Sequence, residues 1–187
     1  MTALWIIQLA LIVVSIVLAA VARRIRRPWL GGAGIVPLAL GVVTLAFGVP
    51  PEAPSDGWAV ATGFALAALA VIAGGPAAAT VLDVATQKDV PRGAHGGIMI
   101  LSARAGGGSD RTEVLRGGAA IGYLERIAIV AAVVTGHLEI VAAVIAIKGL
   151  GRFSELDSAE ARERFIIGTF ASMIWAGAVA ALIVLPA

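Results

Sequence analysis

Cysteine is absent from this sequence of 187 residues, and histidine occurs only twice. Without cysteine the chain has no disulfide framework, no thiolate metal site and no cysteine nucleophile. Two histidines leave little for a histidine-based metal site. The cysteine content therefore does not indicate whether the protein lies in an oxidising or a reducing compartment. We expect neither a metal nor another cofactor.

Charged residues are also scarce, at 14% of the chain against 59% hydrophobic residues. With a mean hydropathy of +0.97, the chain carries more apolar material than one soluble core of this size could bury. The isoelectric point of about 9.7 would suggest nucleic acid as the partner of a soluble domain, but the net charge is only +2. We therefore expect an integral membrane protein whose partner is the lipid bilayer and not nucleic acid.

The apolar residues fall into segments that suit helices, since a crossing needs about 20 mostly apolar residues. We expect an all-α bundle in a single membrane domain, residues 1–187, with six spans at about 4–22, 30–49, 58–85, 119–135, 138–150 and 165–185. Gly74, Gly75 and Pro76 predict a bend in the third segment. Residues 86–116 read as a polar loop. Its run AGGGSDRT lacks the order of a phosphate-binding loop and is typical of a flexible linker.

The placement of the Lys and Arg residues predicts the orientation. All of them lie on one side of the membrane if the RRIRR cluster, the 86–116 loop and residues 148–164 share that side, with Arg126 inside an apolar stretch. The positive-inside rule makes that side the cytoplasm and puts both termini outside. The residues expected to face anionic lipid head groups are Arg23, Arg24, Arg26, Arg27, Arg104, Arg111, Arg116 and Arg152.

The stretch from 119 to 150 predicts two helices joined by a tight turn at Thr135, Gly136 and His137. At about 1.5 Å per residue they reach roughly 26 and 20 Å, which hardly crosses about 30 Å of hydrocarbon. Either both helices span, or they form a re-entrant hairpin beside four spans. Six spans are favoured, because a carboxylate such as Glu139 is costly inside the bilayer.

Part of this stretch resembles a known family. The runs GYLER, IAIKGLGRFSEL and FIIGTFAS are similar to the C-terminal membrane segment of a family of bacterial integral membrane proteins of unknown function, whose members read IGxLER, AAKSxxRFxEL and LIGTLxS. The resemblance covers residues 117–175 and departs from the family at Gly149, where serine is usual. It implies a bacterial plasma membrane protein with polar residues in its spans, and it carries no reaction.

Four charged residues stand inside or beside the apolar segments, namely Asp83, Glu125, Arg126 and Lys148. Lys148 has a stem long enough to reach toward Glu125 or toward the membrane interface, and Asp83 is the expected counter-charge for Arg126. These groups either form buried ion pairs that determine helix packing, or they line a path for an ion. His137 and Glu139 are expected at the outer turn, as surface polar residues or a polar site.

Three function classes stay open on this reading. The first is a small homo-oligomeric transporter or channel for an ion or small solute. The second is a non-catalytic accessory or scaffold protein. The third is an enzyme acting on a membrane lipid or polyprenyl phosphate at the cytoplasmic interface, which the sequence favours least, because it offers no convincing set of catalytic residues.

Overall fold

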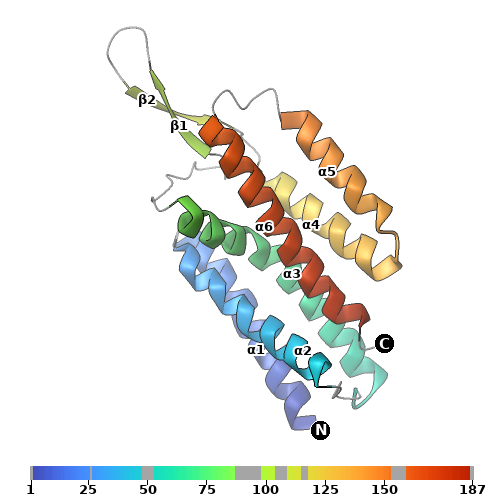
Figure 1. Ribbon diagram of the computed structural model, residues 1–187. Helices are drawn as coiled ribbons and strands as arrows, with labels where there is room; N and C mark the ends of the chain where they lie inside the picture. Colours follow the sequence, from blue (N-terminus) through green and yellow to red (C-terminus); the bar gives the residue numbers. More distant parts are fainter. Residues whose placement is uncertain are drawn as a thin grey trace.

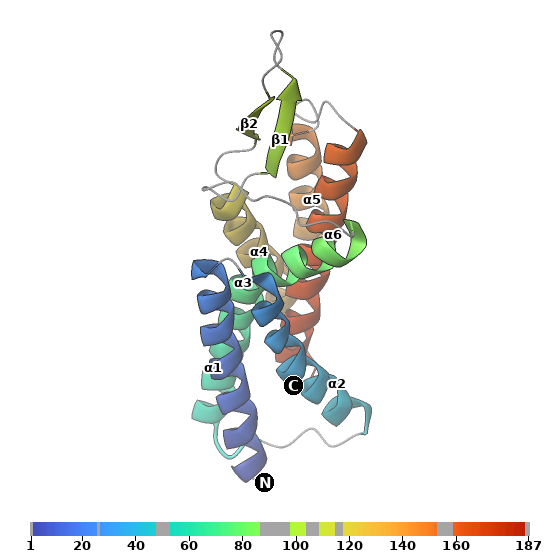
Figure 2. The same ribbon diagram turned by 90° about the vertical axis from the view of Figure 1, so that its left-hand side faces the viewer.

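The computed structural model describes residues 2–25, 27–47, 53–86, 98–103, 109–114, 118–152 and 159–185. Figures 1 and 2 show a bundle of helices with a small β-hairpin at one end. The helices are α1 (Thr2–Arg24), the 3-10 helix η1 (Pro28–Gly34), α2 (Ile35–Ala46), α3 (Asp56–Thr86), α4 (Gly118–Thr135), α5 (Glu139–Arg152) and α6 (Ala159–Val184). The strands β1 (Ile98–Ala103) and β2 (Ser109–Val114) stand between α3 and α4.

The helices α3 and α6 pack against each other at the centre of the bundle. Helix α1 and η1 pack on α3, α4 packs on both α3 and α6, and α5 packs chiefly on α4. Successive helices run in alternating directions, and both chain termini lie at the end away from the β-hairpin (Figures 1 and 2). We call the end that carries β1 and β2 the hairpin end, and the end with the termini the terminal end.

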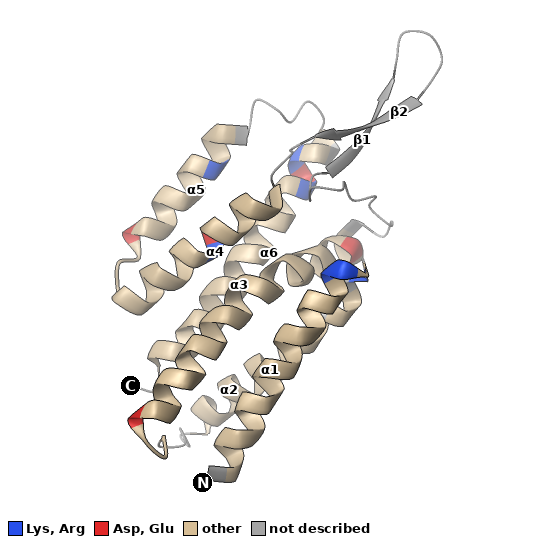
Figure 3. Cartoon of the chain, turned by 180° about the vertical axis from the view of Figure 1, so that it is seen from behind, with Lys and Arg blue, Asp and Glu red and all other residues tan. Residues whose placement is uncertain are grey.

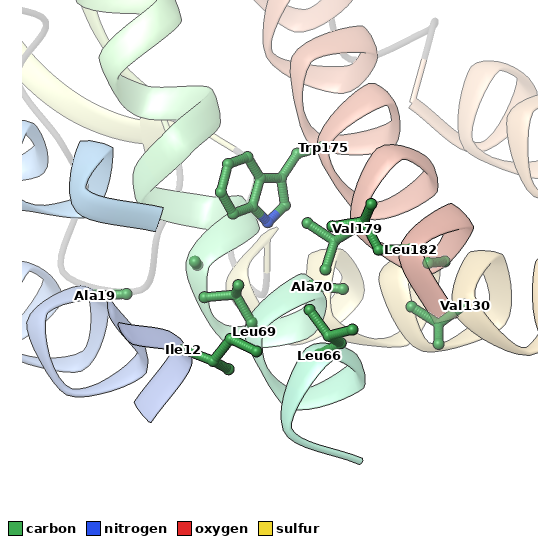
Figure 4. Close-up of a cluster of buried hydrophobic side chains, with 11 residues drawn as sticks. Ile12, Ala19, Leu66, Leu69, Ala70, Val130, Trp175, Val179 and Leu182 are labelled. Carbon is green, nitrogen blue, oxygen red and sulfur yellow. The ribbon is translucent and has the colours of Figure 1, made fainter. Parts of the chain in front are cut away.

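A continuous apolar core joins α1, α3, α4 and α6. Ile12 of α1, Leu69 of α3 and Val179 of α6 are fully buried, and Val130 of α4 packs against the same cluster (Figure 4). Many apolar side chains on the outer faces are exposed instead, including Phe64. A soluble protein rarely exposes so many large apolar side chains, whereas helices that face lipid require them.

Trp175 of α6 is the largest side chain in this core and fits only because two neighbours are glycines. A Cβ on Gly34 would lie 2.6 Å from the indole ring of Trp175, and one on Gly74 would lie 3.1 Å from it. Helices approach closely where small residues face a bulky one. These contacts fix how η1 and α3 lie against α6.

Four helices, α1, α3, α4 and α6, are long and apolar enough to cross a membrane, by length and composition. They correspond to the segments expected at 4–22, 58–85, 119–135 and 165–185. The span expected at 30–49 is not among the four long helices, because Pro28–Gly34 forms a 3-10 helix and the α-helix that follows it covers only Ile35–Ala46. The glycines in PWLGGAG disfavour an α-helix, and Pro28 suits the first helical turn.

The membrane domain is helical as expected, and the 86–116 segment, predicted as a polar loop, contains a β-hairpin that was not predicted. Strands β1 and β2 pair antiparallel, from Ile98 opposite Val114 to Ala103 opposite Ser109. The apolar run IMIL and the β-branched residues near Thr112 have strand propensity. The run AGGGSDRT is therefore not a linker throughout, since β2 begins within it at Ser109.

The bend expected in the third segment is visible in α3, whose direction changes along its length (Figures 1 and 2). The helix is nevertheless continuous from Asp56 to Thr86 and contains Pro76. Proline lacks the N–H that an α-helix needs and its ring presses on the preceding turn, which bends the helix without ending it.

The turn between α4 and α5 has a defined helix-ending geometry. Gly136 has a φ of +75°, a left-handed conformation that favours glycine. The backbone N–H of His137 donates to the carbonyl of Ala132 at 2.8 Å, and that of Gly136 donates to Val133 at 3.3 Å. This pair of bonds is a Schellman motif, and it confirms the predicted tight turn.

Candidate functional site: a cationic cavity between α3, α4 and α6

Arg126 lies near the middle of α4 and is only 5% exposed. Its Nε donates a hydrogen bond to the carbonyl oxygen of Val71 on α3 at 2.8 Å, and its Nη1 donates to Oγ of Ser172 on α6 at 3.0 Å. A backbone carbonyl has two lone pairs, so that of Val71 can accept this bond beside its helical one. One guanidinium therefore joins three helices.

Two glycines make room for this arginine. A Cβ on Gly74 would collide with Cδ of Arg126 and would lie 2.9 Å from its Nε. A Cβ on Gly122, one turn before Arg126 on α4, would lie 3.1 Å from Nη1. From the sequence, Gly74 was expected to contribute to a bend, whereas in the structure it also leaves the space for a buried cation.

Tyr123 lies between two arginines. The Cζ atoms of Arg23, at the end of α1, and of Arg126 lie 4.7 and 5.1 Å from the centre of its ring. Both distances are within the range of a cation–π contact. Tyr123 was not among the site residues predicted from the sequence. The available signals were that it is the only tyrosine of the chain and that it stands three residues before Arg126 on a helix.

Lys148 and Glu125 form an ion pair that ties α5 to α4. The distance from Nζ to Oε2 is 2.5 Å, and the two side chains are 16% and 10% exposed. Nζ also lies 5.9 Å from the ring centre of Phe165 on α6. The structure brings Lys148 and Glu125 together as the sequence predicted, because the two antiparallel helices place them at the same level.

The predicted pairing of Asp83 with Arg126 is wrong. Within the described part of the chain, Arg126 makes no ion pair. Its hydrogen bonds go to the neutral oxygens of Val71 and Ser172. Asp83 is half-buried, makes contacts of its own and stands about two turns beyond Pro76. The negative charge that acts most on Arg126 is that of Glu125, its neighbour in sequence.

A cavity of about 230 Å³ opens beside Arg126, between α3, α4 and α6. Three cationic side chains line it, and they are Arg126, Lys148 and Arg164. Two hydroxyl side chains, Thr169 and Ser172, line it as well. None of the described residues that line this cavity carries a carboxylate, although Glu125 is paired with the lining residue Lys148. Its polar lining is therefore positively charged and rich in hydrogen-bond donors.

The predicted outer-turn pair is present as a contact. Nδ1 of His137 lies 3.0 Å from Oε1 of Glu139, and the two side chains are 64% and 74% exposed. Glu139 also begins α5, where a negative charge interacts favourably with the helix dipole. The pair has the properties of a solvated turn. In the described ranges of the chain, no three His, Asp or Glu side chains gather in a way that could hold a metal ion.

Cations gather toward the hairpin end. Figure 3 shows blue segments at the end of α1, on α5 and at the start of α6, and none among the described residues at the terminal end. Arg23, Arg24 and Arg27 are exposed there. Of the other residues predicted to face lipid head groups, Arg26, Arg104 and Arg116 lie outside the described residues, as do the side chains of Arg111 and Arg152.

Comparison with known proteins adds no relative: no family model, no curated protein and no solved structure matches the chain. The resemblance of residues 117–175 to a bacterial membrane family stays a prediction.

Proposed function

We propose that this chain is a multi-span protein of the bacterial plasma membrane that carries a small ion or solute across it. The observation that carries the proposal is the cavity beside Arg126, because charged groups inside membrane helices are costly and commonly mark a substrate path. The four long apolar helices provide the membrane context. The cavity between α3, α4 and α6 provides the binding site.

Six spans with both termini outside are the arrangement that best suits this proposal. Helix η1 at about 2.0 Å per residue and α2 at about 1.5 Å per residue together rise roughly 32 Å, close to the thickness of the hydrocarbon. The turn from Gly136 to Glu139 is exposed, whereas a re-entrant turn would need protein around its backbone. The cations at the hairpin end support a cytoplasmic location for that end.

An accessory or scaffold role is the second candidate, and a specific observation favours it. Arg126 joins α4 to α3 and α6, and the pair of Lys148 with Glu125 joins α5 to α4. Polar contacts of this kind can serve to determine which helices pack together. An accessory protein would need these bonds but no solute in the cavity.

A flux screen in proteoliposomes separates the two. Wild-type protein would be tested against protons, monovalent cations and small anions, beside empty liposomes. We expect flux above the empty liposomes for at least one solute. Gly168→Leu, which fills the cavity without removing a charge, should reduce that flux, while Arg24→Gln at an exposed position should not change it. No flux for any solute in this panel would overturn the transporter proposal and favour the accessory role.

A further inference from the structure

We infer that the cavity between α3, α4 and α6 binds an oxyanion of the phosphate type. This inference deepens the proposed function and rests on it for its biological setting. Three cationic side chains from three helices line the cavity, namely Arg126 of α4, Lys148 of α5 and Arg164 of α6. A cation would be repelled from such a lining, whereas rings of Arg and Lys select anions.

The charge balance around Arg126 supports an anionic ligand. Lys148 already has Glu125 as its ion-pair partner. Arg126 has hydrogen bonds only to neutral oxygens among the described residues, so its charge lacks a carboxylate in direct contact. A buried charge is strongly stabilised by an opposite charge in hydrogen-bond contact. An anion in the adjacent cavity would supply that charge.

The geometry of the guanidinium leaves donors for this ligand. Arginine has five N–H donors, and the two bonds to Val71 and Ser172 use two of them. Nη2 lies 4.0 Å from the position of a Cβ on Gly75 and 3.8 Å from one on Gly122. Both glycines line the cavity, so this nitrogen lies beside its wall. Arginine presents its donors in a planar fork that matches phosphate oxygens.

The hydroxyl groups extend the set of donors. Oγ of Ser172 accepts the hydrogen bond from Nη1 of Arg126, which leaves its own O–H free to donate to a ligand. Thr169 stands three residues earlier on α6, on the same face of the helix, and also lines the cavity. Donors from charged and neutral groups thus converge on one space, as oxyanion sites require.

Two sources could supply a phosphate group at this place. One is free inorganic phosphate or a small phosphorylated solute, and the other is the head group of an anionic phospholipid. Both present the same oxygens to Arg126. The cavity volume of about 230 Å³ has room for a tetrahedral oxyanion together with water. Binding of inorganic phosphate and binding of phosphatidylglycerol distinguish the two sources.

The test uses a variant that fills the cavity without removing a charge. Gly168 lines the cavity, and a Cβ added there would meet nothing within 4 Å, so Gly168→Leu should fold and occupy the space. Gly177→Leu is the matched control. It is a glycine of the same helix with equally open surroundings, and it does not line the cavity.

Binding would be measured with two probes on delipidated full-length protein in detergent. The first probe is inorganic phosphate, measured by calorimetry at constant ionic strength with chloride as the control anion. The second probe is phosphatidylglycerol in mixed micelles, with phosphatidylcholine as the control lipid. We expect the wild type to bind at least one probe, Gly168→Leu to bind it about tenfold or more weakly, and Gly177→Leu to bind it as the wild type does.

Each outcome decides the inference. Phosphate binding with this variant pattern supports a free oxyanion, and binding of phosphatidylglycerol alone with the same pattern supports a lipid head group. No binding of either probe to the wild type, or equal binding to Gly168→Leu, overturns the oxyanion site. If Gly168→Leu does not fold, Thr169→Val keeps the shape and removes one donor, and it should weaken binding several-fold. Unchanged binding to that variant would then overturn the site.

The results distinguish the absence of an oxyanion site from the absence of a transport function. Flux of a cation without oxyanion binding would keep the transporter and remove this site. Oxyanion binding that depends on Gly168, without flux of any solute, would keep the site and remove the transporter.

Discussion

Nε of Arg126 on α4 donates a hydrogen bond of 2.8 Å to the backbone carbonyl oxygen of Val71 on α3. This bond joins a charged side chain to the main chain of another helix at a point where Gly74 allows close approach. In a low-dielectric environment a charge-assisted bond is strong, and losing it leaves a polar group unsatisfied. The first two predictions test this relationship.

Arg126→Ala should destabilise the fold by about 2–4 kcal/mol, because it removes two charge-assisted hydrogen bonds and leaves a void. Arg24→Ala, at an exposed position on α1, should change stability by about 0.5 kcal/mol or less. The measurement is the midpoint of SDS-induced unfolding in detergent micelles. Equal midpoints for the two variants would mean that Arg126 is solvated.

Gly74→Ala should destabilise the protein by about 1–3 kcal/mol, because the new methyl group overlaps the side chain of Arg126 and approaches Trp175. Gly63→Ala is the control on the same helix, where a Cβ would meet Ile183 at an ordinary 3.7 Å. Since alanine is the better helix former, this control should be neutral or stabilising by up to about 1 kcal/mol. The reverse order of unfolding midpoints would contradict the packing described.

The ion pair of Glu125 with Lys148 predicts strong coupling in a double-mutant cycle. Glu125→Gln and Lys148→Met should each destabilise by about 3–5 kcal/mol, because each leaves one charge uncompensated at a largely buried position. The double variant should lose less than the two losses combined, since it leaves no isolated charge. Additive losses would show that the two groups act independently.

Labelling of single cysteines tests the proposed orientation in a chain that has none of its own. Cysteines at Ser55 and at Gly136, in the connections of the terminal end, should react with an impermeant thiol reagent in intact cells. A cysteine at Ser109 in β2 should react only after lysis. Reaction at Ser55 but not at Gly136 would instead support the re-entrant hairpin, and reaction only at Ser109 would invert the orientation.

Helix positions were largely predictable from local properties of the sequence. The apolar runs predicted α1, α3, α4 and α6, because length and hydropathy are local quantities. The turn at Gly136 was predicted as well, since a glycine there suits the left-handed end of a helix. The 3-10 helix and the β-hairpin were missed, because short segments carry weak periodicity.

Of the two ion pairs considered from the sequence, the structure contains that of Lys148 with Glu125 but not that of Asp83 with Arg126. Lys148 and Glu125 lie on consecutive antiparallel helices, so their register follows from the turn that joins them. Arg126 was assigned to Asp83, but its partners Val71 and Ser172 are neutral and carry no signal in the sequence. Every residue has a backbone carbonyl, so no local feature of the sequence identifies the carbonyl that accepts the hydrogen bond from Arg126.

What the sequence determined by itself is the apolar helical character of this protein, the tight turn before α5 and the collection of cations toward one end, because each follows from residues close together in the chain. What only the tertiary structure decided is the cavity. Its cationic lining comes from Arg126, Lys148 and Arg164, on three different helices. These side chains meet because Gly74 and Gly122 let α3 and α4 close around a guanidinium, and close approach between distant segments depends on packing in three dimensions.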